Sequence, residues 1–285
     1  MLVPFLIMLR EGIEAALIVG IIASYLKQTG RGEWMPAVWI GVFLAAALAL
    51  LVGGGLEWVS AEFPQKQQEL FEGVIGLVAV GILSSMVFWM RKVARSIKHS
   101  LHASLDAALA TSKNQVYALI AMVFFAVARE GLETVFFLLA VFQQSEGTAA
   151  PMGALLGLIL AIGVGFAIYS GSMRLNLGLF FRWTGLFILV VAAGILSTSV
   201  QALHEAGLWN HLQTIVFDIS AALPMDGPLG SVLAGMFGYQ DAPTVSTLSV
   251  YLIYLIGALV LFFLPAPGAQ SAKPAHRQSS SATNE

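Results

Sequence analysis

The chain opens with a long apolar stretch, residues 2–26 (LVPFLIMLREGIEAALIVGIIASYL), which is interrupted at its centre by Arg10-Glu11-Gly12-Ile13-Glu14. Almost the same five residues return as Arg129-Glu130-Gly131-Leu132-Glu133 inside a second apolar stretch, residues 115–142. Charged side chains at bilayer depth are costly, and they usually face the interior of a helix bundle or a pathway through it. Two copies of one costly motif therefore predict two helices that build one site.

The composition indicates an integral membrane protein. Of the 285 residues, 58% are hydrophobic and only 11% are charged, and the mean hydropathy is +0.84, whereas a soluble domain usually carries about 25% charged residues. The chain has no cysteine, which excludes disulfides, thiolate metal sites and iron–sulfur clusters. Any metal must therefore be held by oxygen or imidazole ligands.

Seven apolar stretches are long enough to cross a hydrocarbon core of ~30 Å, which takes about 20 helical residues. Lipid offers no partner for backbone polar groups, so spanning segments are expected to be helices. The predicted fold class is an all-α integral membrane protein with seven transmembrane helices. The predicted spans are residues 2–26, 34–56, 70–90, 115–142, 151–171, 178–202 and 248–264.

The distribution of basic residues predicts that the N-terminus lies outside and the C-terminus inside. In this N-out/C-in orientation the cytoplasmic segments hold 11 of the 14 Lys and Arg residues, in agreement with the positive-inside rule. Acidic residues gather on the outer side, where they would concentrate cations near an entrance or simply form a solvated surface. These acids are Glu57, Glu62, Glu69, Glu72, Glu146, Glu205, Asp218, Asp226 and Asp241.

The two halves of the chain read as a repeat of inverted topology. Besides the charged motif, the third and sixth spans share the phrases Gly81-Ile82-Leu83-Ser84-Ser85 and Gly194-Ile195-Leu196-Ser197-Thr198. The first span enters from outside and the fourth from inside, so the halves would have opposite orientation, a common plan of transporters with the substrate site at the repeat interface. The predicted transmembrane domain, 1–264, comprises repeat one (1–90), repeat two (115–202) and a seventh helix (248–264).

Three segments lie between or beyond these spans. Residues 91–114 combine apolar residues at every fourth position with basic ones, which predicts a cytoplasmic amphipathic segment on the membrane surface. Residues 203–247 form a periplasmic loop, whose apolar part at 212–223 is a candidate interfacial or re-entrant cover. The tail, 265–285, is rich in Pro, Ser and Ala and is expected to be a disordered cytoplasmic segment.

The four motif glutamates are predicted to meet near the membrane midplane. Counted from the outer ends of their spans, Glu11 and Glu133 are each ~13 Å deep and Glu14 and Glu130 each ~18 Å. In antiparallel neighbours, Glu11 would face Glu133 and Glu14 would face Glu130. The two acids of each motif are three residues apart and share one helix face.

The rest of the motif supports such a cluster. Arg10 and Arg129 each precede a glutamate by four residues and can pair with it, while Gly12 and Gly131 allow close helix approach. Four carboxylates and two guanidinium groups leave a formal charge of −2, which a hard multivalent cation could balance with oxygen ligands. The alternative is that crossed Arg–Glu pairs merely hold the two repeats together.

The doubled Arg-Glu-Gly-(Leu/Ile)-Glu motif, in the first and fourth of seven spans, resembles the oxidase-dependent iron transporter family. That family includes fungal high-affinity iron permeases and bacterial permeases. Ile13 stands where Leu is commoner, a change that should not affect ligation. Supporting phrases are Phe63–Lys66, Phe71–Gly73, Met86–Lys92 and His204–Trp209.

The resemblance implies an iron-uptake permease of the bacterial cytoplasmic (inner) membrane, with ferric iron favoured after periplasmic oxidation of ferrous iron. Iron is then the transported substrate, and no cofactor is expected. The implied partners are a periplasmic cupredoxin-like iron-binding protein and a haem peroxidase, with membrane lipid and no nucleic acid. The implied iron ligands are Glu11, Glu14, Glu130 and Glu133, flanked by Arg10 and Arg129, with Glu72, Glu69 and Glu205 as weaker candidates.

Two other functions compete with this interpretation. One is a transporter of another hard or divalent cation, or a proton-coupled carrier that uses the carboxylates as relays. The other is an intramembrane enzyme, which is disfavoured because the sequence lacks His-Glu-x-x-His, paired Asp-rich motifs and any Ser/His constellation. We therefore expect no enzymatic activity.

Overall fold

The computed structural model describes residues 1–61, 63–93, 105, 115–142, 148–170, 176–225 and 227–264. Within them a helix covers most of each of the seven stretches predicted to span the membrane, and the all-helical class is confirmed. The helices are α1 (Leu2–Gln28), the short 3-10 helix η1 (Gly32–Trp34), α2 (Met35–Ala61), α3 (Gln65–Val93), α5 (Gln115–Phe142), α6 (Ala149–Tyr169), α7 (Leu177–Glu205), α8 (Pro228–Phe237) and α9 (Val245–Phe263).

Five of these helices, α2, α3, α6, α7 and α9, are long and apolar enough to cross a membrane. The other two long helices, α1 and α5, carry the charged motifs. Large apolar side chains cover the outside, as at Leu50 on α2 and Ile253 on α9, which are 77% and 73% exposed. Such a surface needs an apolar solvent, so the chain is a multi-pass membrane protein.

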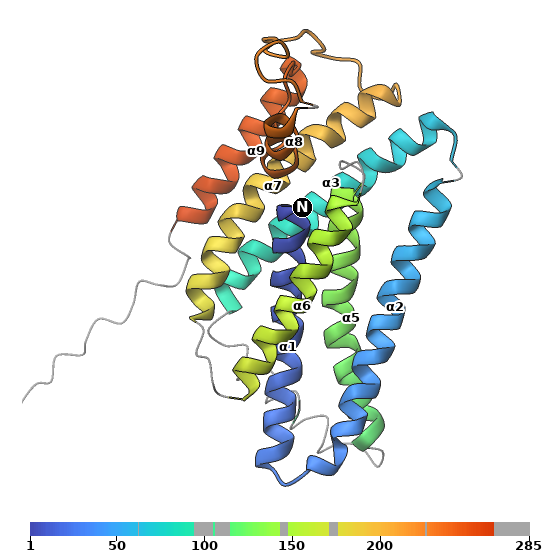
Figure 1. The fold of residues 1–285 in the computed structure, drawn as a ribbon, viewed down its shortest axis with the longest axis vertical. Helices are drawn as coiled ribbons and strands as arrows, with labels where there is room; N and C mark the ends of the chain where they lie inside the picture. The colour runs from blue at the N-terminus through green and yellow to red at the C-terminus, as the bar shows by residue number, and fades with distance from the viewer. Residues whose placement is uncertain are drawn as a thin grey trace, which may run out of the picture.

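Three helix pairs make the most extensive contacts: α1 with α6, α2 with α5, and α3 with α7. In Figure 1, α2 runs along one side of the molecule next to α5, and α9 lies on the opposite side against α7. Small residues allow the close approaches. A Cβ atom at Gly12 would lie 2.5 Å from Ala161 Cβ of α6, and one at Gly131 would lie 3.1 Å from Ala49 Cβ of α2.

The two motif helices are antiparallel, and each passes through two apolar clusters. Val3 and Ile7, near the start of α1, belong to the same cluster as Phe137, near the end of α5. Ile22 and Leu26, near the end of α1, share the second cluster with Leu119 and other residues near the start of α5. The charged motifs lie between these clusters, so apolar packing encloses the polar residues from both ends.

The segments outside the spans are only partly described. Of the predicted amphipathic segment, 91–114, α3 includes residues 91–93 and Leu105 is buried in the second cluster; the remainder and the tail, 265–285, lie outside the described residues. The 203–247 loop contains α8, which lies later than the apolar part at 212–223. Helix α8 is capped at its C-terminal end by Gly238, which adopts a left-handed conformation with φ of +65°. The backbone of Gly238 lies close to that of Gly194 in α7.

Candidate metal centre

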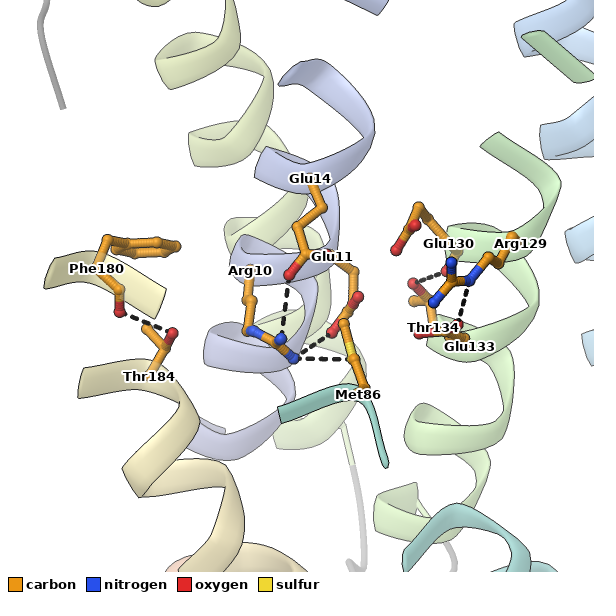
Figure 2. Close-up of polar contacts among 10 residues, drawn as sticks. All are labelled: Arg10, Glu11, Glu14, Met86, Arg129, Glu130, Glu133, Thr134, Phe180 and Thr184. Carbon is orange, nitrogen blue, oxygen red and sulfur yellow. Dashed lines mark hydrogen bonds and ion pairs between the residues drawn. The ribbon is translucent and has the colours of Figure 1, made fainter. Parts of the chain in front are cut away.

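The first motif forms a buried ion-pair cluster on α1 (Figure 2). Arg10 Nη1 donates a hydrogen bond to Glu11 Oε1 at 3.1 Å, and Arg10 Nη2 lies 3.1 Å from Glu14 Oε1. The Arg10 side chain is only 1% exposed. Its Nη1 also lies 3.1 Å from Met86 Sδ of α3, and its guanidinium carbon lies 6.0 Å from the centre of the Phe181 ring of α7. One arginine therefore holds both acids of its motif.

The second motif on α5 is arranged differently. Arg129 Nε donates to Glu133 Oε1 at 2.9 Å, and the Arg129 side chain is 49% exposed. Its guanidinium carbon lies 4.6 Å from the centre of the Trp89 ring of α3. Both arginines thus pair with the acid four residues later, as the spacing predicted. Each ion pair found among the described residues joins two residues of the same helix, α1 or α5, so none of these pairs links α1 to α5.

Three of the four motif glutamates come together. Glu11 and Glu14 of α1 and Glu130 of α5 each offer a carboxylate oxygen, and these oxygens lie within 4.8 Å of one another. Figure 2 shows Glu130 extending from α5 toward the two acids of α1. We call these three residues the carboxylate triad. Together with Arg10 the triad carries a formal charge of −2, because Arg129 and Glu133 neutralise each other.

The triad has unsatisfied acceptors. Oε2 of Glu11 and Oε2 of Glu130 are buried without a hydrogen-bond partner in the structure, and so is Oε2 of Glu133, which lies outside the triad. A buried charged acceptor without a donor or a counter-ion is strongly unfavourable. Two oxygens that share a cation at about 2.0–2.6 Å lie at most about 5 Å apart, so the triad has the spacing of a cation site. With oxygen ligands alone, it suits a hard cation.

The remaining sequence candidates lie elsewhere. Glu133 is held by Arg129 and is not part of the triad. Glu69 accepts a hydrogen bond from Gln65 Nε2, and Glu205 accepts one from Gln201 Nε2, each at 3.1 Å. Glu72 interacts electrostatically with both acids where α3 meets α7. Within the part of the chain that is described, Glu69, Glu72 and Glu205 do not form a group compact enough for three-ligand coordination.

Sequence reasoning missed the residues that support the arginines. Met86, Trp89 and Phe181 are apolar or aromatic, and in a membrane helix nothing in their type separates them from residues that contact lipid. It also missed a cavity of about 660 Å³ between α1, α2, α5 and α6, into which Glu11 and Glu130 face as lining residues. The signal for it, a run of Ala and Gly on α2, is ordinarily a sign of close helix packing.

Comparison with known proteins adds a family to this geometry. The model of the iron permease FTR1 family matches residues 1–273. The chain is 63% identical over 265 residues to the ferrous iron permease EfeU of Yersinia pestis, covering 93% of this chain and 94% of that protein. It is 58% identical over 272 residues to the ferrous iron permease EfeU of Escherichia coli O157:H7, covering 95% and 99%. No solved structure matches the chain.

Proposed function

The chain belongs to the iron permease FTR1 family, and from this premise we propose that it takes up iron across the bacterial cytoplasmic membrane by way of the carboxylate triad. The observation that carries the proposal is the buried formal charge of −2 on Glu11, Glu14, Glu130 and Arg10. Keeping a net negative charge inside a helix bundle costs considerable free energy. Fe²⁺ would balance this charge as it passes through the site, and Fe³⁺ would exceed it by one unit.

The proposal extends to Glu133 as a fourth ligand. Its Oε2 is buried without a hydrogen-bond partner, while Oε1 is occupied by Arg129. Because the Arg129 side chain is about half exposed, it has room to turn away from the bundle interior and release the carboxylate. A fourth oxygen would add charge and coordination suited to ferric iron, which we favour as the transported form after oxidation of ferrous iron on the outer side.

The relatives are named for ferrous iron, which is compatible with ferrous iron reaching the outer face before it is oxidised. The two oxidation states can be separated with purified protein in liposomes. Radioactive iron is supplied either as Fe²⁺ kept reduced by ascorbate or as Fe³⁺ citrate. Faster uptake of Fe³⁺ supports the ferric proposal, and uptake of Fe²⁺ alone contradicts it.

We further propose seven membrane spans in the N-out/C-in orientation, built as an inverted repeat of residues 1–90 and 115–202 with α9 added. The pattern of helix contacts supports this. If the repeats are exchanged, α1 maps onto α5 and α2 onto α6, so the α1–α6 contact becomes the α5–α2 contact, and both are present. The close approaches at Gly12 and Gly131 correspond in the same way.

The proposed partners act at the outer face, where the acidic residues outside the two motifs are predicted to lie. A periplasmic cupredoxin-like iron-binding protein would deliver iron there, and a haem peroxidase would oxidise it. These two partners are proposed on the family resemblance. Uptake in cells that lack either periplasmic protein, compared with uptake by the isolated permease, tests the assignment.

The central experiment is radioactive-iron uptake by liposomes containing Glu11→Gln, Glu14→Gln or Glu130→Gln variants. Each change keeps the side-chain size and removes one charge from the triad. We expect uptake to fall to the level of protein-free liposomes, while detergent-extracted protein elutes as the parent does. Normal uptake by all three variants would remove the proposed ligands.

The same liposomes distinguish the alternative functions. Excess Mn²⁺ or Zn²⁺ that suppresses iron uptake completely would favour a transporter of other divalent cations. Proton movement without any metal, followed with a pH-sensitive dye inside the liposomes, would favour a proton carrier. Iron uptake that resists both ions and moves no protons in the absence of metal supports the iron permease.

A further inference from the structure

The cavity beside the carboxylate triad has an unusual wall. On α2 it is lined by small residues at intervals of three and four, which places them on one helix face. They are Ala45, Ala46, Ala49, Gly53 and Gly54; Leu50 lines the cavity beside them, and the same face continues to Glu57. Such residues normally let helices close up. Here they border a space of about 660 Å³.

The cavity reaches from the triad toward the C-terminal end of α2. Ala49 lies opposite Gly131, the neighbour of Glu130. Glu57 lies eight residues farther along α2, which is ~12 Å at 1.5 Å per residue. Gly53 faces Val135 and the cavity is also lined by Phe142, so α5 accompanies it in the same direction. The cavity therefore joins two levels of the bundle.

Carboxylates are present at both ends of the cavity, at the triad and near the C-terminal end of α2. Glu11 and Glu130 line the cavity, and the Oε2 atom of each is buried without a hydrogen-bond partner. At the other level Glu57 is exposed. A dry cavity would leave the Oε2 atoms of Glu11 and Glu130 without solvation, at a cost of several kcal/mol. The volume admits about 20 water molecules at ~30 Å³ each, and water in it would donate hydrogen bonds to both Oε2 atoms.

We infer that this cavity is a water-filled vestibule that leads a hydrated iron cation to the carboxylate triad, and that Glu57 is the residue that captures the cation at its mouth. The inference rests on the proposed function, because it gives the route and the first contact of the same substrate. Small residues on α2 keep the vestibule wide enough for water. The acid at the mouth raises the local concentration of cations, as a charged cleft does.

The first test compares Glu57→Gln with Glu33→Gln, another exposed acid, which lies in η1 just before the opposite end of α2. In liposomes, Glu57→Gln should raise the KM for iron by at least roughly threefold and leave the maximal rate unchanged, because capture is electrostatic. The KM difference from the parent should shrink at high salt. Glu33→Gln should behave as the parent. An unchanged KM in Glu57→Gln would overturn the role of Glu57.

The second test uses the absence of cysteine from the chain. Gly54 and Gly55 are neighbours, and a Cβ atom at either would meet no heavy atom within 4 Å, but only Gly54 lines the cavity. The variants Gly54→Cys and Gly55→Cys are treated from outside the cell with a membrane-impermeant cationic thiol reagent. Only the Gly54→Cys thiol should react, and the reaction should reduce its iron uptake.

The outcomes distinguish a failure of the vestibule hypothesis from a failure of the proposed function. Equal labelling of both variants, no labelling of Gly54→Cys, or labelling without loss of uptake would each overturn the vestibule. If the unlabelled parent moves no iron, the proposed function fails, while labelling of Gly54→Cys alone still reports a water-filled cavity. An uncharged lipophilic reagent that labels Gly54→Cys in place of the cationic one would identify the space as a lipid-filled groove.

Discussion

The two motif helices carry almost the same five residues and use them differently. On α1, Arg10 is buried and holds both acids of its motif. On α5, Arg129 is half exposed and holds only Glu133, which leaves Glu130 free to join the acids of α1. The difference shows that the motif supplies the charges, while the surroundings decide which carboxylate is neutralised and which is presented.

Those surroundings come from the third span, α3, and from α7. Arg10 lies against Met86 and Phe181, which exclude water from it, whereas Arg129 lies over the face of Trp89. Inverted-repeat transporters work by exchanging the conformations of their halves around a fixed site. If this chain is such a repeat, as proposed, one conformation should contain an unequal pair of motifs. Four sets of variants test how far the two motifs differ.

The largest expected effect separates the two arginines. Arg10→Gln leaves Glu11 and Glu14 buried without a counter-ion, and breaking a buried pair in this way costs about 3–5 kcal/mol. Arg129→Gln breaks a pair with a single carboxylate, Glu133, and the Arg129 side chain is 49% exposed, so a smaller loss of stability is expected. Thermal unfolding in detergent should show a large loss of melting temperature for Arg10→Gln and a small one for Arg129→Gln. Equal losses would mean that the two motifs are energetically equivalent.

Because a strongly destabilised variant is recovered in small amounts, Arg10→Lys serves as a companion to Arg10→Gln. It keeps the charge and loses the two-pronged geometry of the guanidinium group. We expect a melting temperature between those of the parent and Arg10→Gln. A value equal to that of Arg10→Gln would show that geometry, and not charge, stabilises the first motif.

How much of this was predictable from the sequence follows from the same residues. The ends of α1 and α5 fall within two residues of the predicted 2–26 and 115–142, since a bilayer fixes the length of an apolar helix. The pairing of Arg10 with Glu14 follows from helix geometry. The addition of Glu11 to that pair and the exposure of Arg129 depend on side chains of α3 and α7, which no spacing within the motif encodes.

The 203–247 loop illustrates a second limit. Its apolar part at 212–223 remains a candidate interfacial or re-entrant cover, whereas the helix α8, at Pro228–Phe237, was not predicted. That helix is stabilised by contact with α7 through Gly238 and Gly194, a long-range approach of two backbones. Hydropathy predicts which segments can lie in lipid. It does not predict which distant part of the backbone a loop will contact.

A smaller effect is expected at the motif glycines. A Cβ at Gly12 would lie 2.5 Å from Ala161 Cβ, whereas one at Gly131 would lie 3.1 Å from Ala49 Cβ. Overpacking costs about 1–3 kcal/mol, and replacing Gly by Ala in a helix gains about 1 kcal/mol. Gly12→Ala should therefore lower the melting temperature, while Gly131→Ala should leave it nearly unchanged. The double variant Gly12→Ala/Ala161→Gly should recover most of the loss; no recovery would place the strain elsewhere.

The smallest effect concerns the aromatic contacts of the two arginines. A cation–π contact at an exposed site is worth about 0.5–1 kcal/mol, and Arg129 lies 4.6 Å from the Trp89 ring, against 6.0 Å between Arg10 and the Phe181 ring. Double-mutant cycles isolate each contact from the packing that a single substitution removes. The cycle of Trp89→Leu with Arg129→Gln should give a coupling in that range, measured as unfolding free energy in detergent. The cycle of Phe181→Leu with Arg10→Gln should give a smaller one, because two carboxylates already hold Arg10 in place. A larger coupling at Phe181 would mean that the buried arginine is positioned by its aromatic neighbour and not by its acids. The difference between the two motifs would then be caused by the aromatic rings of α3 and α7.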